Sequence, residues 1–190
     1  GDYYTAVELY RTAARTNPSY DKPLIGLAES YFALGEYAEA LANVQKARQF
    51  DRGSSYILSL EGRIRIGIGD FEGARKLFEQ VLQREPNNLD SRFGLAELDI
   101  AAGKTKNAID KYEEALRVSP ENRRALLSLI VLYDELNDTV KSEEYVKQAL
   151  RYYTGNPQVH FFAGKHYLIR GRLADAERET RTALSVQPNY

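Results

Sequence analysis

A fixed period of 34 residues constrains this chain more than any other feature of its sequence. Four glycines, with an asparagine in the one gap between them, recur at this spacing without an insertion or deletion: Gly35, Gly69, Gly103, Asn137 and Gly171. A period of 20 to 50 residues is the signature of a repeat protein, in which small units stack on their neighbours. The sequence therefore has to be interpreted repeat by repeat.

Small residues mark two further positions in each repeat. The first series lies five residues after each turn position and comprises Ala40, Ala74, Ala108, Ser142 and Ala176, with Ala6 as its N-terminal extension. The second series lies seven residues further on and comprises Ala13, Ala47, Val81, Ala115, Ala149 and Ala183. Small side chains allow two helix axes to pack at about 8 to 10 Å. These positions therefore predict helix crossings.

The turn positions and a series of prolines predict where the helices end. Glycine, with asparagine as the next best choice, adopts the left-handed backbone that ends one helix and turns the chain into the next. Prolines follow the second small-residue series by five residues at Pro18, Pro86, Pro120 and Pro188, with Arg52 and Thr154 in the other two places. Proline lacks the amide hydrogen that would continue a helix, so it separates one hairpin from the next.

Between these marks the apolar residues recur at helical spacing. Leu24, Leu27, Tyr31 and Leu34 form one such stripe, and no segment of comparable length alternates like a strand. We therefore predict an all-α chain of eleven helices in antiparallel pairs. A lone second helix in a truncated repeat, residues 2–20, precedes full repeats over residues 21–54, 55–88, 89–122, 123–156 and 157–190.

The pattern resembles the tetratricopeptide repeat over essentially the whole chain. The first full repeat matches best, with Leu24, Leu27, Ala28, Tyr31, Gly35, Tyr37, Ala40 and Ala47. The fourth departs most, with Ile130, Asn137, Thr139, Ser142 and Thr154 in place of the usual choices. The resemblance implies a right-handed superhelical solenoid of antiparallel helix pairs with about five and a half repeats. We expect the chain to be a fragment of a larger repeat-containing protein.

Charge and composition argue against several classes of partner. The chain has 26 basic and 27 acidic residues, so its net charge of −1 supplies no attraction for a polyanion, and we expect no nucleic-acid partner. No apolar run approaches the roughly 18 residues of a membrane span, so we expect no direct membrane insertion. The absence of cysteine excludes disulfides and thiolate sites but fits the cytoplasm and the periplasm equally.

The sequence contains no recognisable catalytic or metal-binding constellation. His160 and His166 lie six residues apart, which turns them about 240° from each other on a helix. Neighbouring carboxylates such as Glu113 and Glu114 diverge by about 100°, whereas catalytic pairs must converge. We therefore predict no enzymatic activity, no catalytic residues, no cofactor and no metal site.

In the family that the pattern resembles, the first helices of successive repeats line a concave face that binds peptides. When the peptide-binding positions of that face are transferred to this chain by repeat register, the candidate groove residues are Ile25, Glu29, Phe32, Tyr56, Arg63, Ile66, Phe93, Glu97, Ile100, Arg124, Leu127, Val131, Phe161, Lys165 and Leu168. The large apolar members need not be exposed to complete the repeat pattern, and an open apolar patch usually has a partner. We expect a protein partner that presents an amphipathic helix or an extended peptide.

Other interpretations of these residues stay open. The apolar residues at the twelfth position of each repeat could pack only against the next repeat, and Glu29, Arg63 and Glu97 could pair with one another. Tyr153 is a minor surface candidate. Two family specialisations are disfavoured because other residues occupy the positions that they require. The positions of a carboxylate clamp hold Ile25, Glu29, Leu60 and Glu97. The positions of an asparagine ladder hold Gly26, Leu60, Gly94, Ser128 and Phe162.

The functional hypotheses are therefore three. The first is an adaptor that binds a peptide in its groove. The second is an assembly subunit that mediates self-association or complex formation through its edges or convex face. The third is a recruitment module for a catalytic domain that lies outside this chain.

Overall fold

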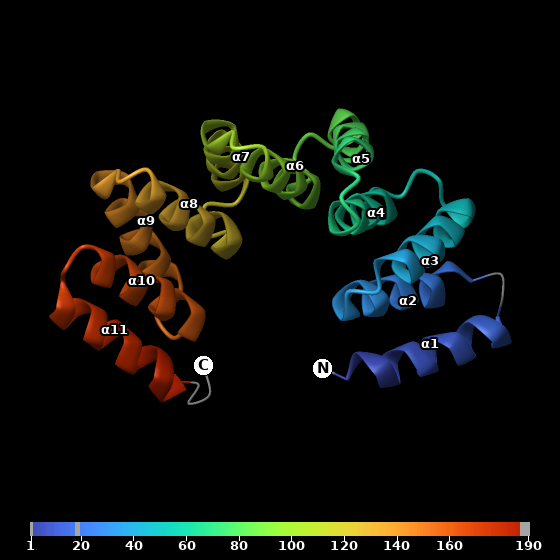
Figure 1. Ribbon diagram of the computed structural model, residues 1–190, viewed down its shortest axis with the longest axis horizontal. Coiled ribbons are helices and arrows are strands. Elements are labelled where there is room, and N and C mark those ends of the chain that lie inside the picture. Colours follow the sequence, from blue (N-terminus) through green and yellow to red (C-terminus); the bar gives the residue numbers. More distant parts are fainter. Residues whose placement is uncertain (1, 18–19, 187–190) are drawn as a thin grey trace. The chain divides into compact units, whose positions relative to one another are not determined.

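The computed structural model describes residues 2–17 and 20–186 (Figure 1). Within these ranges it contains eleven helices and no strand, which confirms the all-α prediction. The helices are α1 (Tyr3–Thr16), α2 (Asp21–Leu34), α3 (Tyr37–Phe50), α4 (Ser55–Gly67), α5 (Phe71–Arg84), α6 (Leu89–Ala101), α7 (Thr105–Val118), α8 (Arg123–Glu135), α9 (Thr139–Tyr152), α10 (Pro157–Ile169) and α11 (Leu173–Val186). Of the prolines expected to separate the hairpins, Pro18 and Pro188 lie outside the described residues.

Side-chain caps fix where most of the first helices begin. Ser54, Asn88, Asn122 and Asn156 each accept a hydrogen bond from the amide three residues further on. Such a cap stabilises a helix by about 0.5 to 2 kcal/mol relative to alanine. The capping residues follow the 34-residue period, so they form a further periodic series beside the turns, the small residues and the prolines.

The turns within the hairpins have the predicted left-handed backbone. Among the described residues, positive φ angles occur at Gly35, Gly69, Gly103 and Gly171, and Asn137 is the one non-glycine example, at 57°. After α2, the amide of Glu36 donates to the carbonyl of Tyr31 at 2.9 Å, and that of Gly35 donates to Phe32 at 3.1 Å. These bonds satisfy the last carbonyls of the helix.

The chain divides into two compact units, which we call the N-terminal block (Gly1–Gly103) and the C-terminal block (Lys104–Tyr190). In the N-terminal block, α2 with α3 and α4 with α5 form antiparallel hairpins, α1 packs on α2, and α6 packs on α4 and α5 (Figure 1). In the C-terminal block, α8 with α9 and α10 with α11 form hairpins, and α7 packs on α8. The third repeat contributes α6 to one block and α7 to the other.

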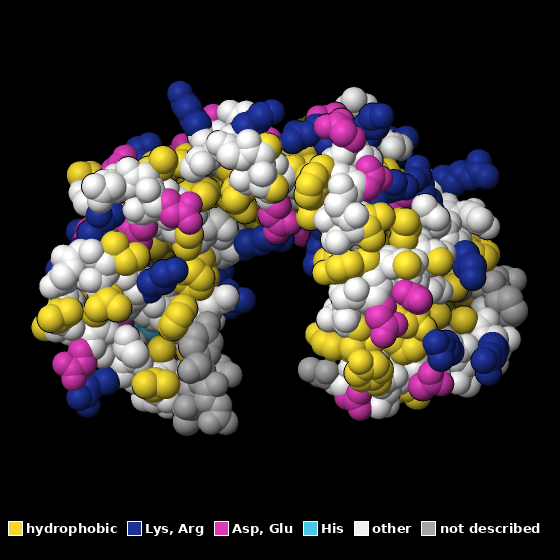
Figure 2. Space-filling view, in the orientation of Figure 1, with side chains coloured by type: hydrophobic (Ala, Val, Ile, Leu, Met, Phe, Trp, Pro, Cys, Tyr) yellow, Lys and Arg dark blue, Asp and Glu magenta, His cyan; other side chains and the backbone are white. Residues whose placement is uncertain are grey.

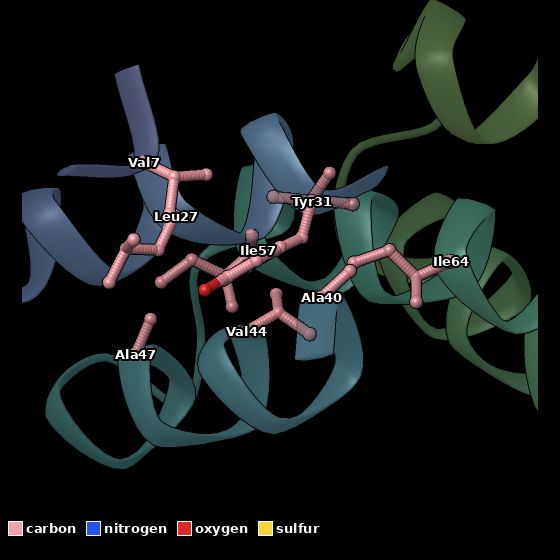
Figure 3. Close-up of a cluster of buried hydrophobic side chains, with 10 residues drawn as sticks. Val7, Leu27, Tyr31, Ala40, Val44, Ala47, Ile57 and Ile64 are labelled. Atoms are coloured by element: carbon pink, nitrogen blue, oxygen red, sulfur yellow. The ribbon is translucent and has the colours of Figure 1, made fainter. Parts of the chain in front are cut away.

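The core of each block lies between its helices. Figure 3 shows the main cluster of the N-terminal block, in which Leu27 and Tyr31 of α2 meet Val44 of α3 and Ile57 of α4. The residues predicted to lie at helix crossings are buried in every full repeat: Ala40, Ala74, Ala108, Ser142, Ala176, Ala47, Val81, Ala115, Ala149 and Ala183. Ala6 and Ala13, on α1, are half-buried.

Candidate interaction surface

The first helices of the N-terminal block carry nine of the nominated groove residues. They are Ile25, Glu29 and Phe32 on α2, Tyr56, Arg63 and Ile66 on α4, and Phe93, Glu97 and Ile100 on α6. Tyr56 and Ile100 are exposed, whereas Ile25, Phe32 and Ile66 are partly buried and pack against the core clusters of this block. The nominated positions therefore do not form one uniformly open apolar face.

A polar and aromatic group joins α2 to α4 on this surface. The hydroxyl of Tyr56 donates to Oε1 of Glu29, and the guanidinium of Arg63 lies 5.0 Å from the centre of the Phe32 ring. A cation over an aromatic face contributes about 0.5 to 1 kcal/mol at an exposed site. Within the described residues, no ion pair joins Glu29 to Arg63, so these two charges engage Tyr56 and Phe32 instead of each other.

The protonation of Tyr56 follows from this contact. Burial raises the pKa of the Tyr56 phenol to about 12, and the hydrogen bond to the Glu29 carboxylate adds to the effect. The phenol therefore stays neutral and acts as a donor throughout the physiological range. A ligand in this region meets a glutamate that is already held by a neighbouring side chain.

Two nominated residues belong to the core and not to an open surface. Phe93 on α6 and Leu127 on α8 are only 3% and 6% exposed, and Leu127 packs with Leu126 and Ile130 in the core of the C-terminal block. The expectation that these side chains face a ligand was wrong. Helical register gives the direction of a side chain but not the depth to which its neighbours cover it.

In the C-terminal block, the open apolar surface is on α10. Phe161, Leu168 and Ile169 are 45%, 59% and 54% exposed. Lys165 is exposed between them. The spacing i, i+4, i+7 places Phe161, Lys165 and Leu168 on one side of the helix, with Ile169 beside them. We call these four residues the α10 stripe.

The remaining nominated residues of this block lie on α8. Arg124 is exposed and Val131 is partly buried. Figure 2 shows that, on the visible face of each block, exposed hydrophobic side chains lie among charged ones.

A small hollow separates the α10 stripe from α8. Its apolar walls are Ile130, Val131, Phe162 and Ile169, and its polar rim consists of Asp134, Glu135 and Lys165. It encloses about 130 Å³, which is room for roughly four water molecules or one branched aliphatic side chain. We call it the α8-side hollow.

A larger and shallower hollow lies on the other side of the stripe, against α11. Phe161, Gly164, Leu168, Leu173 and Ala176 form its apolar part, and Lys165, Glu177, Thr180 and Arg181 form its polar part. It encloses about 630 Å³. We call it the α11-side hollow. Leu173 was not nominated from the sequence, because it lies at the start of a second helix.

Tyr153, the minor surface candidate, is occupied within its own block. Its hydroxyl donates to the carbonyl oxygen of Glu121, and the guanidinium of Arg123 lies 5.9 Å from the ring centre. The ring is partly buried against the core of the C-terminal block. Tyr153 therefore does not belong to the candidate surface.

The two histidines are structural links between helices. Nδ1 and Nε2 of His166 lie 2.8 Å from Oδ1 of Asp134 and 3.1 Å from Oε2 of Glu143. In His160, Nδ1 lies 2.7 Å from Oε2 of Glu179, and Nε2 lies 2.7 Å from the carbonyl oxygen of Thr154. Both nitrogens of each ring therefore lie within hydrogen-bond distance of an oxygen from another part of the chain.

These contacts tie α10 to α8, α9 and α11. The two rings engage different carboxylates, and the described part of the chain holds no group of three or more potential ligands arranged for a metal ion. In the same ranges, no helix combines the length and the apolar character that crossing a membrane requires.

Comparison with known proteins identifies the repeat. The family model described as tetratricopeptide repeat matches residues 1–64, 67–106 and 99–160. Protein CTR9 homolog of Arabidopsis thaliana is 25% identical over 190 residues, covering 98% of this chain and 14% of that protein. BBSome complex member BBS4 of Bos taurus is 25% identical over 171 residues, covering 90% of this chain and 33% of that protein. The chain thus spans a third or less of these relatives.

A solved structure has the same fold. The thermophilic TPR protein TTC0263 of Thermus thermophilus superposes with a TM-score of 0.75 and 24% sequence identity, covering 89% of this chain and 92% of that one.

Proposed function

Because the chain belongs to the tetratricopeptide-repeat family, we propose that it is a protein-interaction module that binds a peptide or an amphipathic helix along the first helices of its repeats. Repeat scaffolds of this kind are generally non-catalytic. The observation that carries the proposal is the α10 stripe, which presents Phe161, Leu168 and Ile169 to solvent between two hollows. Exposed apolar residues gathered in this way are typical of a protein-binding surface.

The relatives support a role in protein complexes. BBS4 is named as a member of the BBSome complex. The surface of the N-terminal block adds Tyr56, Arg63 and Ile100, which are exposed on the first helices α4 and α6. Tyrosine and arginine are enriched among the residues that dominate binding energies.

A capture experiment tests this function. The chain and an Arg63→Glu, Leu168→Ala variant are immobilised, and proteins from the source organism are captured on both. Neither substitution removes a buried side chain, so circular dichroism should show the same fold. We expect at least one partner to bind the native chain and to be depleted about tenfold on the variant.

A matched control carries Arg151→Glu and Val140→Ala, which alter an exposed arginine and an exposed apolar residue on the second helix α9. Its partners should be those of the native chain. Equal capture by all three proteins would contradict a role for the first helices.

Assembly by self-association is the second candidate function, and α1 favours it. Tyr4 and Leu9 on this helix are 69% and 67% exposed, and large apolar residues on one helix invite association. Sedimentation velocity between about 5 and 200 μM should then show a rising mass that Leu9→Asp abolishes. A constant monomer mass would eliminate this candidate.

A further inference from the structure

The charge at the centre of the α10 stripe specifies the chemistry of its ligand. Lys165 borders both the α8-side and the α11-side hollow, and among the described residues it is the one that the two hollows share. The Lys165 side chain therefore stands between the apolar walls of the two hollows. A ligand that fills both hollows therefore passes over it.

The other charged residues around the hollows either pair with an opposite charge within the chain or border only one of the two hollows. Oδ1 of Asp134 is 2.8 Å from His166 and 3.1 Å from Arg170, and Glu177 pairs with Arg181 at 2.6 Å.

Glu135 borders only the α8-side hollow. Lys165 forms no hydrogen bond or ion pair with any residue in the described ranges. The one charge that lies between the hollows without an internal partner is thus positive.

From this arrangement we infer that the α10 stripe binds an acidic amphipathic segment of another protein, in which an Asp or Glu lies between two large apolar residues. This inference deepens the proposed function and rests on it. The two apolar side chains enter the α8-side and α11-side hollows, and the carboxylate between them pairs with Lys165. The apolar contacts provide most of the binding energy, and the ion pair selects an acidic ligand over a basic one.

Helical spacing gives the form of the simplest probe. A ligand helix presents residues i, i+4 and i+7 on one face. The probe is a labelled helical peptide with leucines at the first and third of these positions and glutamate at the second. A matched peptide carries lysine in place of the glutamate, and a third carries alanines in place of the leucines.

Fluorescence anisotropy with these peptides tests the inference. On the native chain, we expect the glutamate peptide to bind about tenfold or more tightly than the lysine peptide, and the alanine peptide to bind weakest. In Lys165→Glu the order of the glutamate and lysine peptides should reverse, because residue 165 then repels the peptide glutamate and attracts the peptide lysine. Lys106→Glu, which makes the same change in charge at an exposed position on α7, should keep the native order.

Several results would overturn the inference. Equal affinities for the glutamate and lysine peptides, an unchanged order in Lys165→Glu, or no binding of either peptide at about 1 mM would each do so. Self-association that Leu168→Asp abolishes, seen by sedimentation equilibrium, would instead assign the stripe to a second copy of this chain. Partner capture that depends on Arg63 but not on Lys165 would retain the proposed function while rejecting this inference.

Discussion

At the scale of single residues, Phe78 shows how closely neighbouring repeats of the N-terminal block approach each other. Its ring is fully buried. A Cβ atom added to Gly62 on α4 would lie 2.6 Å from Cε1 of this ring, and one added to Gly94 on α6 would also meet the ring too closely. The ring therefore occupies the space that the two glycines leave open.

We predict that Gly62→Ala destabilises the chain. Alanine is a better helix former than glycine by about 1 kcal/mol, but overpacking a close-packed core costs about 1 to 3 kcal/mol, so the expected net loss is about 1 kcal/mol. Urea unfolding followed by circular dichroism measures it. Gly53→Ala is the control, because its added methyl group would make only ordinary contacts, at 3.6 Å and beyond. A native or raised midpoint for Gly62→Ala would show that the ring can move aside.

The residue scale also shows the limit of sequence interpretation. Gly35 and Asn137 could be assigned to turns because a left-handed backbone strongly favours these residue types. Leu127 was misplaced because it packs in a core cluster with Val146 and Ala163, which are distant in the sequence. The partners of His166 were missed for the same reason, since Asp134 is 32 residues away.

At the scale of helices, a chain of charged contacts holds the last hairpin in place. Glu143 on α9 accepts hydrogen bonds from His166 on α10, at 3.1 Å, and from Arg172, also at 3.1 Å. Arg172 also forms an ion pair with Asp175 on α11 at 2.7 Å. The hairpin of α10 and α11 that bears the α10 stripe is thus attached to α9 through ionisable groups.

These groups predict a loss of stability in acid. Burial by itself would raise the pKa of Glu143, but the hydrogen bonds from His166 and Arg172 outweigh it and lower the pKa below its ordinary value of 4.5. A carboxyl group with a lowered folded-state pKa stabilises the fold above its unfolded value and loses that contribution as the pH falls through the folded value. Unfolding free energy should therefore decrease below about pH 4.5.

Glu143→Gln tests this assignment. The neutral amide keeps the shape of the side chain but not its charge, so we expect lower stability at pH 7 and a shallower fall between pH 5 and pH 3. Urea midpoints across this range provide the measurement. Glu144→Gln is the control, because Glu144 is exposed and accepts a 3.3 Å bond from the neighbouring Gln148 on its own helix. Parallel pH profiles for Glu143→Gln and the native chain would refute the role of Glu143.

At the scale of elements, the period of the sequence predicted the helices well. The first helices begin at Asp21, Ser55, Leu89, Arg123 and Pro157, because turn residues and caps recur at the same interval. The hollows beside α10 were less accessible to prediction. Leu168 and Leu173 lie in consecutive helices, and only the closing of the hairpin brings them to the same hollow.

At the scale of the whole molecule, the chain combines two blocks that each present first-helix surfaces. The N-terminal block presents a group in which Glu29 and Arg63 already have neighbours, whereas the C-terminal block presents a more apolar stripe with an unopposed Lys165. The two surfaces therefore differ in the ligand chemistry that they favour. A partner that binds both surfaces at once would bind more tightly than one that binds either surface alone, because the second contact becomes intramolecular.

Site-specific photocrosslinking tests the central claim most directly. A photoreactive phenylalanine is placed at Leu168 on the α10 stripe in one protein, and at Val140, which is 77% exposed on α9, in another. The account predicts that irradiation in extract of the source organism yields a discrete crosslinked protein from position 168, in competition with the glutamate peptide, and none from position 140. Equal crosslinking from both positions, or none from position 168, would contradict the claim that this chain binds its partner along the first helices.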